Sequence, residues 1–296
     1  KAISLSHFIS RGSFFAAVFL IAFFSSEQQL TVLAWFHVAS LGIGMIIVLY
    51  HARNLTGFVF KKTNIYLSGL AGYGKFTFGT NISSIFMRNI DSWMLGALRS
   101  PLAVAVYNPA IRIANLFEIP MFTLSSVFFP KAVERIKNEG PHTAKEMYEK
   151  SSGYLVAAIL PFVIVVIIFA EPIILLIAGK DYLETVPILR VTMLYGLIIP
   201  FNRQLGVTLD ALGKAGLNML FVIRNAVLNA ILNYFLIKKY GVIGAAYATL
   251  STYIFALIIN QIYLKVKLGV EISKIASNSF NFYGIALNTI LSKIKK

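Results

Sequence analysis

The sequence predicts an all-α membrane protein with about eight transmembrane helices. Of its 296 residues, 57% are hydrophobic and 13% are charged, and the mean hydropathy is +0.74. Soluble domains carry about twice this share of charged residues, about 25%. Eight stretches of about 20 mostly apolar residues also follow one another, and a helix needs this length to cross the bilayer core. A water-soluble globule is therefore excluded.

The formal net charge of +15 and the pI of 9.9 must be explained within a membrane protein. A nucleic-acid-binding protein carries such an excess on a solvated surface, which this sequence does not offer, so nucleic acid is not an expected partner. The absence of cysteine excludes disulfides and thiolate metal sites. No histidines occur at metal-ligand spacing and no carboxylate pair suits acid–base catalysis. We expect no cofactor, no metal and no enzymatic chemistry.

The predicted spans are stretches of mainly apolar residues separated by short polar connections. In order, they cover residues 7–24, 30–50, 76–98, 104–128, 153–176, 186–210, 215–237 and 242–265. The fifth span contains a break at Glu171 and Pro172. The segment 281–291 is too short to cross the bilayer and is followed by three lysines, so we expect an amphipathic tail on the membrane surface.

The positions of Lys and Arg predict the orientation of the chain. Seventeen of the 27 lie in one set of alternate connections and at the two ends, whereas four lie in the other set. Because Lys and Arg are retained on the cytoplasmic side, the first set and both ends of the chain are expected to be cytoplasmic. The remaining six basic residues, all Arg, lie within the predicted spans.

The long connection 51–75 contains no acidic residue and is the best candidate for a domain boundary. It leaves two spans in residues 1–50 and six spans in residues 76–266, followed by a basic tail at 267–296. We therefore expect two groups of helices joined by a basic cytoplasmic segment.

Depth within the spans singles out three arginines, Arg88, Arg112 and Arg224. A charged side chain at mid-bilayer costs about 2.5–3.5 kcal/mol, so it usually faces a cavity or a partner. Arg88 belongs to a polar stripe in which Asn81, Ser84 and Asp91 fall within an arc of about 80° on the third span. Such a stripe is not expected to face lipid.

The fourth and seventh spans carry similar polar faces. Asn108, Arg112 and Asn115 lie within an arc of about 60°, with Glu118 about 60° beyond it. In the seventh span a row of four asparagines falls within about 80°, while Arg224 projects from another side; the row is Asn218, Asn225, Asn229 and Asn233.

These residues allow a structural and a functional interpretation. In the structural one, Arg88 pairs with Asp91 and the asparagines join helices by hydrogen bonds. In the functional one, deep guanidinium groups bind phosphate, because their planar fork makes bidentate, charge-assisted hydrogen bonds. Arg203 and Asp210, seven residues apart on one face, form either an internal ion pair or a gate. Four prolines in the middle of spans allow kinks, which serve either helix motion or static packing; they are Pro109, Pro120, Pro161 and Pro200.

Several segments, taken in order, resemble the polysaccharide flippases of the multidrug/oligosaccharidyl-lipid/polysaccharide exporter superfamily. They are IDSWMLG from Ile90, VAVYNPA from Val104, LIAGKDYLETVPILR from Leu176, LDALGKAG from Leu209 and NAILNYFLIKKYGVIGAAYATL from Asn229. The sequence departs from the family pattern at Ala105, where the family usually has Gly, and at Ala178, where an aromatic residue often precedes the Gly. The resemblance covers about residues 74–267.

The resemblance implies a transporter of two six-helix lobes around a central cavity. Residues 76–266 would be the complete second lobe and residues 1–50 the last two helices of the first, with about four helices preceding them. It also implies that Arg88 and Arg112 receive the diphosphate of the substrate, with Arg224 as a weaker third. The polar residues Asn81, Asp91, Asn108 and Asn115 would line the cavity, and Arg203, Asp210 and Glu118 would form a gate or ion pairs.

The function implied is translocation of undecaprenyl-diphosphate-linked oligosaccharide across the bacterial cytoplasmic membrane by alternating access. The expected partners are the lipid-linked oligosaccharide, the lipid bilayer, and a polysaccharide polymerase or other glycan-assembly membrane proteins. A cation-coupled drug or small-molecule antiporter of the same superfamily is one alternative, although the spans hold more Arg than carboxylates. A non-transporting membrane scaffold of a glycan-assembly complex is another.

Overall fold

The computed structural model describes residues 2–24, 30–53 and 64–294 of the chain, and all regular structure in these ranges is helical. The chain divides into two compact units, Lys1–Ile65 and Tyr66–Lys296. The division falls inside the basic connection 51–75 that the sequence predicts, although residues 54–63 of that connection lie outside the described residues. The predicted all-α class is confirmed.

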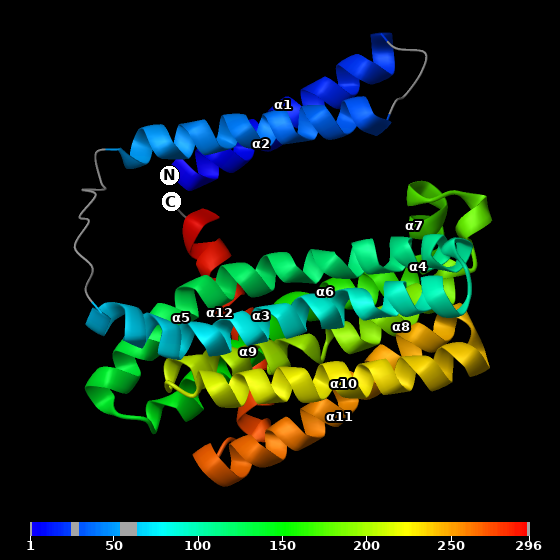
Figure 1. Ribbon diagram of the computed structural model, residues 1–296. Helices are drawn as coiled ribbons and strands as arrows, with labels where there is room; N and C mark the ends of the chain where they lie inside the picture. The colour runs from blue at the N-terminus through cyan, green and yellow to red at the C-terminus, as the bar shows by residue number, and fades with distance from the viewer. Residues whose placement is uncertain (1, 25–29, 54–63, 295–296) are drawn as a thin grey trace. The chain divides into compact units, whose positions relative to one another are not determined.

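The first unit contains two helices that pack closely through small residues (Figure 1). They are α1 (Ala2–Phe24) and α2 (Leu30–Ala52). The hydroxyl of Ser6 donates a hydrogen bond of 2.8 Å to the carbonyl oxygen of Gly44. A Cβ at position 44 would lie 3.1 Å from Ser10 Cβ, so a small residue is needed there for the two backbones to approach.

The second unit contains the remaining helices (Figure 1). They are α3 (Asn64–Leu98), α4 (Pro101–Ala114), α5 (Glu118–Glu139), α6 (Thr143–Ile168), α7 (Ala170–Ile177), α8 (Thr185–Gly196), α9 (Ile199–Ala211), α10 (Ala215–Tyr240), α11 (Val242–Leu268) and α12 (Ile272–Ile294), with 3-10 turns η1 (Asn115–Phe117) and η2 (Lys180–Tyr182). Helix α3 begins before the predicted span at 76–98 and includes the last part of the connection 51–75. This part of the connection contains no proline that would end the helix.

Three predicted spans are broken. The fifth changes from α6 to α7 at Phe169, close to the break predicted at Glu171 and Pro172. The fourth changes from α4 through η1 into α5, and the sixth changes from α8 to α9 at Leu197 and Ile198. Pro120 and Pro200 follow the breaks in the fourth and sixth spans, and the ring of each would clash with the carbonyl group four residues earlier in a continuous α-helix. Pro109 and Pro161, in contrast, lie inside α4 and α6 without a break.

Six helical stretches of the described residues are long and apolar enough to cross a membrane. They are Thr31–Tyr50, Pro101–Glu139, Thr143–Ile168, Thr185–Ala211, Ala215–Tyr240 and Val242–Leu268. Two of the eight predicted spans fall short by these criteria. In α1 only Phe8–Phe19 forms a shorter apolar stretch, and α3 carries the polar stripe around Arg88 that lowers its hydropathy.

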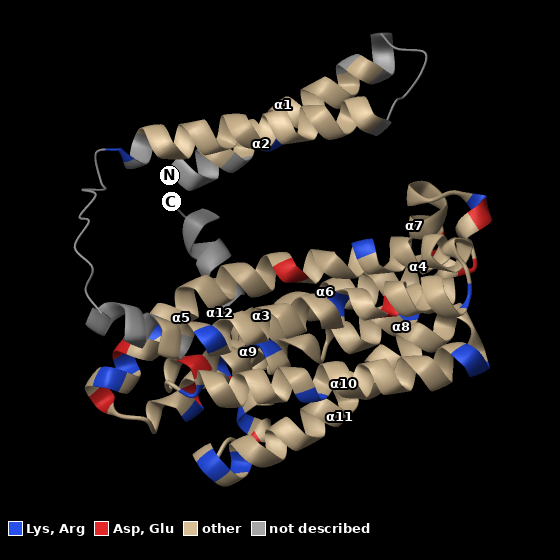
Figure 2. Ribbon diagram, viewed as in Figure 1, with Lys and Arg blue, Asp and Glu red and all other residues tan. Residues whose placement is uncertain are grey.

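The turns α5–α6, α9–α10 and α11–α12 lie at one end of the second unit, which we call the basic end because many Lys and Arg gather there (Figure 2). Gly140, Gly213 and Gly269 in these turns have positive φ angles of 102°, 72° and 69°. Glycine adopts positive φ angles readily, and Gly269 ends α11 in the αL conformation. The turns α3–α4 and α10–α11 lie at the opposite end.

Helix α12 packs against α6, so the predicted surface tail at 267–296 is not a free segment over its first half. The hydroxyl of Ser279 donates to the carbonyl oxygen of Gly153 at 2.9 Å, and that of Tyr283 donates to the carbonyl oxygen of Ala157 at 2.7 Å. A Cβ at position 153 would lie 2.7 Å from the carbonyl oxygen of Ile275. The missing side chain of Gly153 therefore makes this close approach possible.

Candidate functional site

Arg88 of α3 faces Glu118, the first residue of α5. Nη1 of Arg88 lies 3.4 Å from Oε1 of Glu118, and the two side chains are 56% and 57% exposed. Arg88 does not pair with Asp91, as the structural interpretation of the sequence required, because the carboxyl group of Asp91 is buried among other partners. Exposed ion pairs contribute little to stability, typically about 0–1 kcal/mol, so the Arg88 guanidinium remains available to another anion.

Arg112 lies in the last turn of α4, and its side chain is exposed. Within the described part of the chain it forms no ion pair. Arg88 precedes the end of α3 by ten residues and Arg112 follows the start of α4 by eleven, which places both about 15–16 Å from the opposite end of the unit. Two guanidinium groups therefore leave neighbouring antiparallel helices at the same depth.

The asparagines predicted beside these arginines differ in exposure. Asn81 and Asn115 are exposed, and Asn108 is half-buried. Asn115 also caps α4, since its backbone N–H donates to the carbonyl oxygen of Ile111. Amide side chains can donate and accept hydrogen bonds, which suits the hydroxyl groups of a glycan.

Asp91 is the centre of a buried polar cluster that joins four helices. Its Oδ2 accepts hydrogen bonds of 2.7 Å from the hydroxyls of Tyr107 and Thr249, and its Oδ1 accepts one of 2.7 Å from Nδ2 of Asn233. Asn233 also donates to Oδ1 of Asn229 at 3.0 Å. All five side chains are buried. No basic side chain forms an ion pair with Asp91 among the residues described.

The members of this cluster come from the same level of the unit. Asp91 and Asn233 each precede the end of their helix by seven residues, and Tyr107 and Thr249 follow the start of theirs by six and seven. This places the cluster about 10 Å from the opposite end. Sequence reasoning identified the two asparagines and Asp91 but missed Tyr107 and Thr249. Both Tyr107 and Thr249 lie within segments that resemble the family, and that resemblance is the signal that could have found them.

Arg203 and Asp210 do not form the predicted internal pair. Both carboxylate oxygens of Asp210 accept hydrogen bonds of 3.1 Å from Nδ2 of Asn218. Arg203 is exposed and forms no ion pair in the described ranges. Asn218 thus joins α10 to α9 by hydrogen bonds, which is the structural role that the sequence allowed for this row of asparagines.

Arg224 is held by amide oxygens. Its Nη2 donates to Oδ1 of Asn225 at 2.8 Å and to Oδ1 of Asn260 at 3.0 Å, and its Nε donates to Asn225 at 3.1 Å. Nδ2 of Asn260 donates in turn to Oδ1 of Asn202 on α9 at 2.7 Å. The structure therefore places Arg224 in a network with α9 and α11, separate from the contacts of Arg88.

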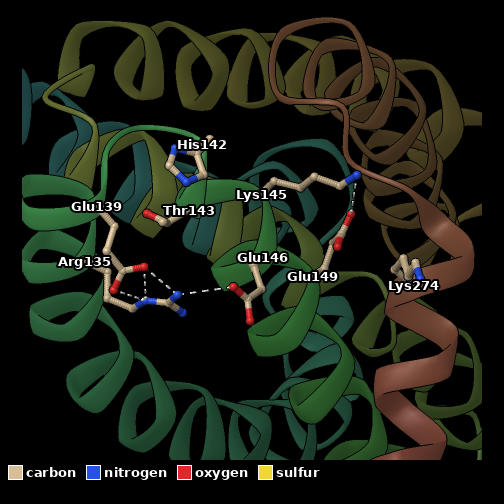
Figure 3. Close-up of a pocket in the computed structure, with 8 residues that line it drawn as sticks. All are labelled: Arg135, Glu139, His142, Thr143, Lys145, Glu146, Glu149 and Lys274. Atoms are coloured by element: carbon tan, nitrogen blue, oxygen red, sulfur yellow. Dashed lines mark hydrogen bonds and ion pairs between the residues drawn. The ribbon is translucent and has the colours of Figure 1, made fainter.

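A pocket of about 380 Å³ opens at the basic end, between the α5–α6 turn and the start of α12 (Figure 3). Ion pairs within its walls include Arg135 with Glu139 at 2.7 Å and Arg135 with Glu146 at 3.4 Å. Lys145 of the wall also pairs with Glu271, outside the lining, at 2.9 Å. The Lys145 ammonium lowers the pKa of the Glu271 carboxyl through this hydrogen bond. The cations of the pocket are therefore largely neutralised by neighbouring carboxylates.

Two curated relatives match the chain. It is 26% identical over 203 residues to an uncharacterized membrane protein of Methanocaldococcus jannaschii, covering 68% of this chain and 40% of that protein. It is 22% identical over 258 residues to the probable low-salt glycan biosynthesis flippase Agl15 of Haloferax volcanii, covering 87% of this chain and 53% of that protein. The chain thus spans about half the length of these relatives, or less.

Solved transporter structures share the fold. The lipid II flippase MurJ in an inward closed conformation matches with a TM-score of 0.69 at 17% identity, covering 98% of this chain and 61% of that chain. An outward-facing multidrug resistance MATE family transporter of the MOP superfamily matches with a TM-score of 0.68 at 16% identity, covering 90% and 62%. Both a lipid II flippase and a multidrug resistance transporter thus have this arrangement of helices.

The model of one protein family matches residues 1–187, which is more than half of the chain, and the family is described as polysaccharide biosynthesis protein. The helices, the order of the motifs and the similarity to flippase and multidrug transporter folds agree with this match. The chain is a multi-pass membrane protein that belongs to the polysaccharide biosynthesis protein family.

Proposed function

We propose that the protein containing this chain is a flippase that moves undecaprenyl-diphosphate-linked oligosaccharide across the cytoplasmic membrane by alternating access. The observation that carries this proposal is the pair Arg88 and Arg112. Their guanidinium groups extend from α3 and α4 at the same depth, Arg88 is only weakly paired, and no ion pair of Arg112 occurs in the described part of the chain. The family match and the flippase relatives support the same function.

The chemistry of the substrate fits these residues. A diphosphate carries several charged oxygens, and a guanidinium group binds two of them through parallel hydrogen bonds. Two such groups would recognise the diphosphate, while Asn81, Asn108 and Asn115 would bind glycan hydroxyls. The prenyl chain would stay in lipid, so only the polar part would need a path through the protein. Glu118 would compete with the diphosphate for Arg88.

We place the basic end of the second unit on the cytoplasmic side, because Lys and Arg in short connections are retained there. In this orientation the diphosphate would enter from the cytoplasm and meet the arginines about 15–16 Å from the opposite end of the unit. The lipid-linked oligosaccharide would be the binding partner of the arginines, and a polysaccharide polymerase would consume the translocated product.

A cation-coupled antiporter of drugs or small molecules is the second candidate. The MATE fold similarity supports it, together with Asp91, a buried carboxylate without a basic partner among the described residues. This candidate predicts that Asp91 is needed for transport while Arg88 and Arg112 are dispensable. The first candidate predicts that both arginines are needed.

The experiment is complementation with the full-length gene in a strain that lacks it, scored by surface glycan. Arg88→Ala and Arg112→Ala should each abolish or strongly reduce glycan export at normal membrane abundance. Arg88→Lys should be partly active, because an ammonium group keeps the charge but loses the bidentate geometry. Arg190→Ala is the matched control, since Arg190 is an exposed arginine of α8 that lies outside the proposed site.

Wild-type glycan export by both alanine variants would overturn the site. A variant with bulky substitutions in the spans should be unable to transport. If glycan export persists in a strain that carries only this variant, the scaffold alternative would replace the flippase. Resistance to cationic drugs that depends on Asp91 but not on Arg88 would favour the antiporter.

A further inference from the structure

Arg224 is half-buried within a predicted span, and its surroundings lack the negative charge that a cation at such a position normally requires. Among the residues described, the guanidinium group donates hydrogen bonds only to the amide oxygens of Asn225 and Asn260, and Arg224 forms no ion pair. Its Cζ also lies 4.9 Å from the centre of the Phe221 ring and 5.7 Å from that of Phe255. Rings and amides orient a guanidinium group, but they do not neutralise it.

A second polar group in the same network has no partner. Asn202 accepts a hydrogen bond from Asn260 through Oδ1, whereas its Nδ2 is buried and donates to no atom of the residues that the structure describes. An unsatisfied buried donor costs about 1–3 kcal/mol. The network formed by Arg224, Asn260 and Asn202 thus offers donors of hydrogen bonds and lacks an anionic acceptor.

Arg224 lies at the border between the buried and the lipid-facing sides of α10. Leu220, Ile223 and Val227 next to it along the helix are exposed, while Asn225 is buried. The facing side of α11 is exposed at Phe255 and Ile258. Figure 1 shows α10 and α11 side by side along one edge of the second unit. A ligand could therefore reach Arg224 from the bilayer, between these two helices.

The depth of Arg224 suits a headgroup at the basic end. It follows the start of α10 by nine residues, or about 13 Å, and Asn260 precedes the end of α11 by eight, or about 12 Å. Helix α10, with 26 residues, is about 39 Å long and exceeds the 30 Å hydrocarbon core by about 9 Å. Because side chains tilt toward the N-terminus of a helix, Arg224 reaches toward the basic end.

We infer that Arg224, with Asn202 and Asn260, forms a binding site for the phosphate of a lipid headgroup in the leaflet at the basic end. The ligand is a phosphate-bearing lipid because the site opens toward apolar residues of α10 and α11, which would contact acyl or prenyl chains. The phosphate supplies the missing charge and an acceptor for the free amide. Basic groups between transmembrane helices are a known setting for anionic lipid headgroups.

This site stands apart from the contacts of Arg88 and Arg112. Binding of bulk phospholipid there does not depend on the proposed transport function, whereas capture of a substrate-type lipid rests on it. Bulk phospholipid and a prenyl diphosphate present the same phosphate chemistry. The first source would make the site a lipid anchor of α10 and α11, and the second would make it a capture site for a lipid of the substrate type. The experiment below distinguishes these sources.

The test is native mass spectrometry of the purified full-length protein, titrated separately with phosphatidic acid, farnesyl diphosphate and inorganic phosphate. Arg224→Gln should raise the apparent Kd for at least one of the two lipids about tenfold, because a charge-assisted bidentate contact is lost. Arg224→Lys should give an intermediate value. Lys265→Gln removes an exposed cation from α11 at the same end and is the matched control; it should leave both affinities within about twofold.

A selective loss of phosphatidic acid binding identifies bulk lipid as the source, and a selective loss of farnesyl diphosphate binding identifies the substrate-type lipid. The inference is overturned if Arg224→Gln binds both lipids like the wild type, if Lys265→Gln loses as much binding, or if inorganic phosphate competes as well as the lipids. Thermal unfolding in phosphatidylcholine checks that Arg224→Gln is folded, and Arg224→Lys carries the test if it is not.

Discussion

The ring of Phe117 lies directly against Gly196, so that a Cβ at position 196 would overlap its Cε2 and Cζ atoms. Phe117 belongs to the 3-10 turn between α4 and α5, and Gly196 is the last residue of α8. Two helices are thus broken at the level where they contact each other. The break in one provides the aromatic ring, and the end of the other provides the space that this ring fills.

Gly196→Ala is expected to destabilise the protein by about 1–3 kcal/mol, because the added methyl group displaces a buried ring from a well-packed site. Chemical unfolding of the full-length protein in detergent measures the effect. Gly74→Ala in α3 is the control, since nothing lies within 4 Å of a Cβ there. In a double-mutant cycle, Phe117→Ala should relieve the cost of Gly196→Ala. Additive effects of the two substitutions would contradict this packing.

Asp91→Ala is expected to lower the free energy of unfolding by about 3 kcal/mol or more, because the donors of Tyr107, Thr249 and Asn233 lose their common acceptor in a buried site. Asp91→Asn keeps one acceptor oxygen and should cost less. Thermal unfolding compares these variants. Asn89→Ala changes an exposed side chain of the same helix and should stay within about 0.5 kcal/mol of the wild type. An equal effect at positions 89 and 91 would refute the role of the cluster.

Gly153→Leu is expected to separate α12 from α6, because its Cβ would lie 2.7 Å from the carbonyl oxygen of Ile275 and 2.8 Å from Asn278 Cβ. A carbodiimide reagent should link Lys145 to Glu271 in the wild-type protein, where Nζ and Oε1 are 2.9 Å apart. The yield of this link should fall severalfold in the variant. Ala158→Leu adds the same bulk to an exposed position of α6 and should leave the yield unchanged.

The contact between Lys145 and Glu271 predicts that docking of the start of α12 weakens in acid. The pKa of Glu271 is lowered by the hydrogen bond from Lys145. Its contribution is therefore complete above the pKa of a free glutamate, about 4.3, and is lost as the pH falls through the lower pKa of the docked form. The mobility of a spin label at Ala276→Cys should rise over this range. The rise should disappear in Glu271→Gln, and its persistence would assign the change to another group.

The sequence was sufficient to predict the helices and the break in the fifth span near Pro172, but not the breaks in the fourth and sixth. The four prolines in the middle of spans all allowed a kink, yet only Pro120 and Pro200 follow a break, whereas Pro109 and Pro161 lie within continuous helices. The difference depends on packing between helices distant in sequence, such as that of Phe117 on Gly196. The position of a proline shows where a backbone hydrogen bond is missing, but not whether packing against a neighbouring helix stabilises a break there.

The candidate site shows a similar limit. Helical spacing placed Arg88 and Asp91 on one face and suggested a pair, but Arg88 meets Glu118, 30 residues later, and Asp91 meets Asn233, 142 residues later. Both partners were recognised as polar residues within spans. What the sequence lacked was the rotation of each helix about its axis, which is set by the packing of the whole unit.

The buried carboxylate of Asp91 has a mechanical consequence. One side chain joins α3, α4, α10 and α11 by short hydrogen bonds, and all of them lie about 10 Å from the same end of the unit. Helices fastened together at one level can spread apart mainly at the other. Asp91 therefore acts as a pivot, and any widening of this bundle is directed toward the basic end, where the turns between helices carry most of the charge.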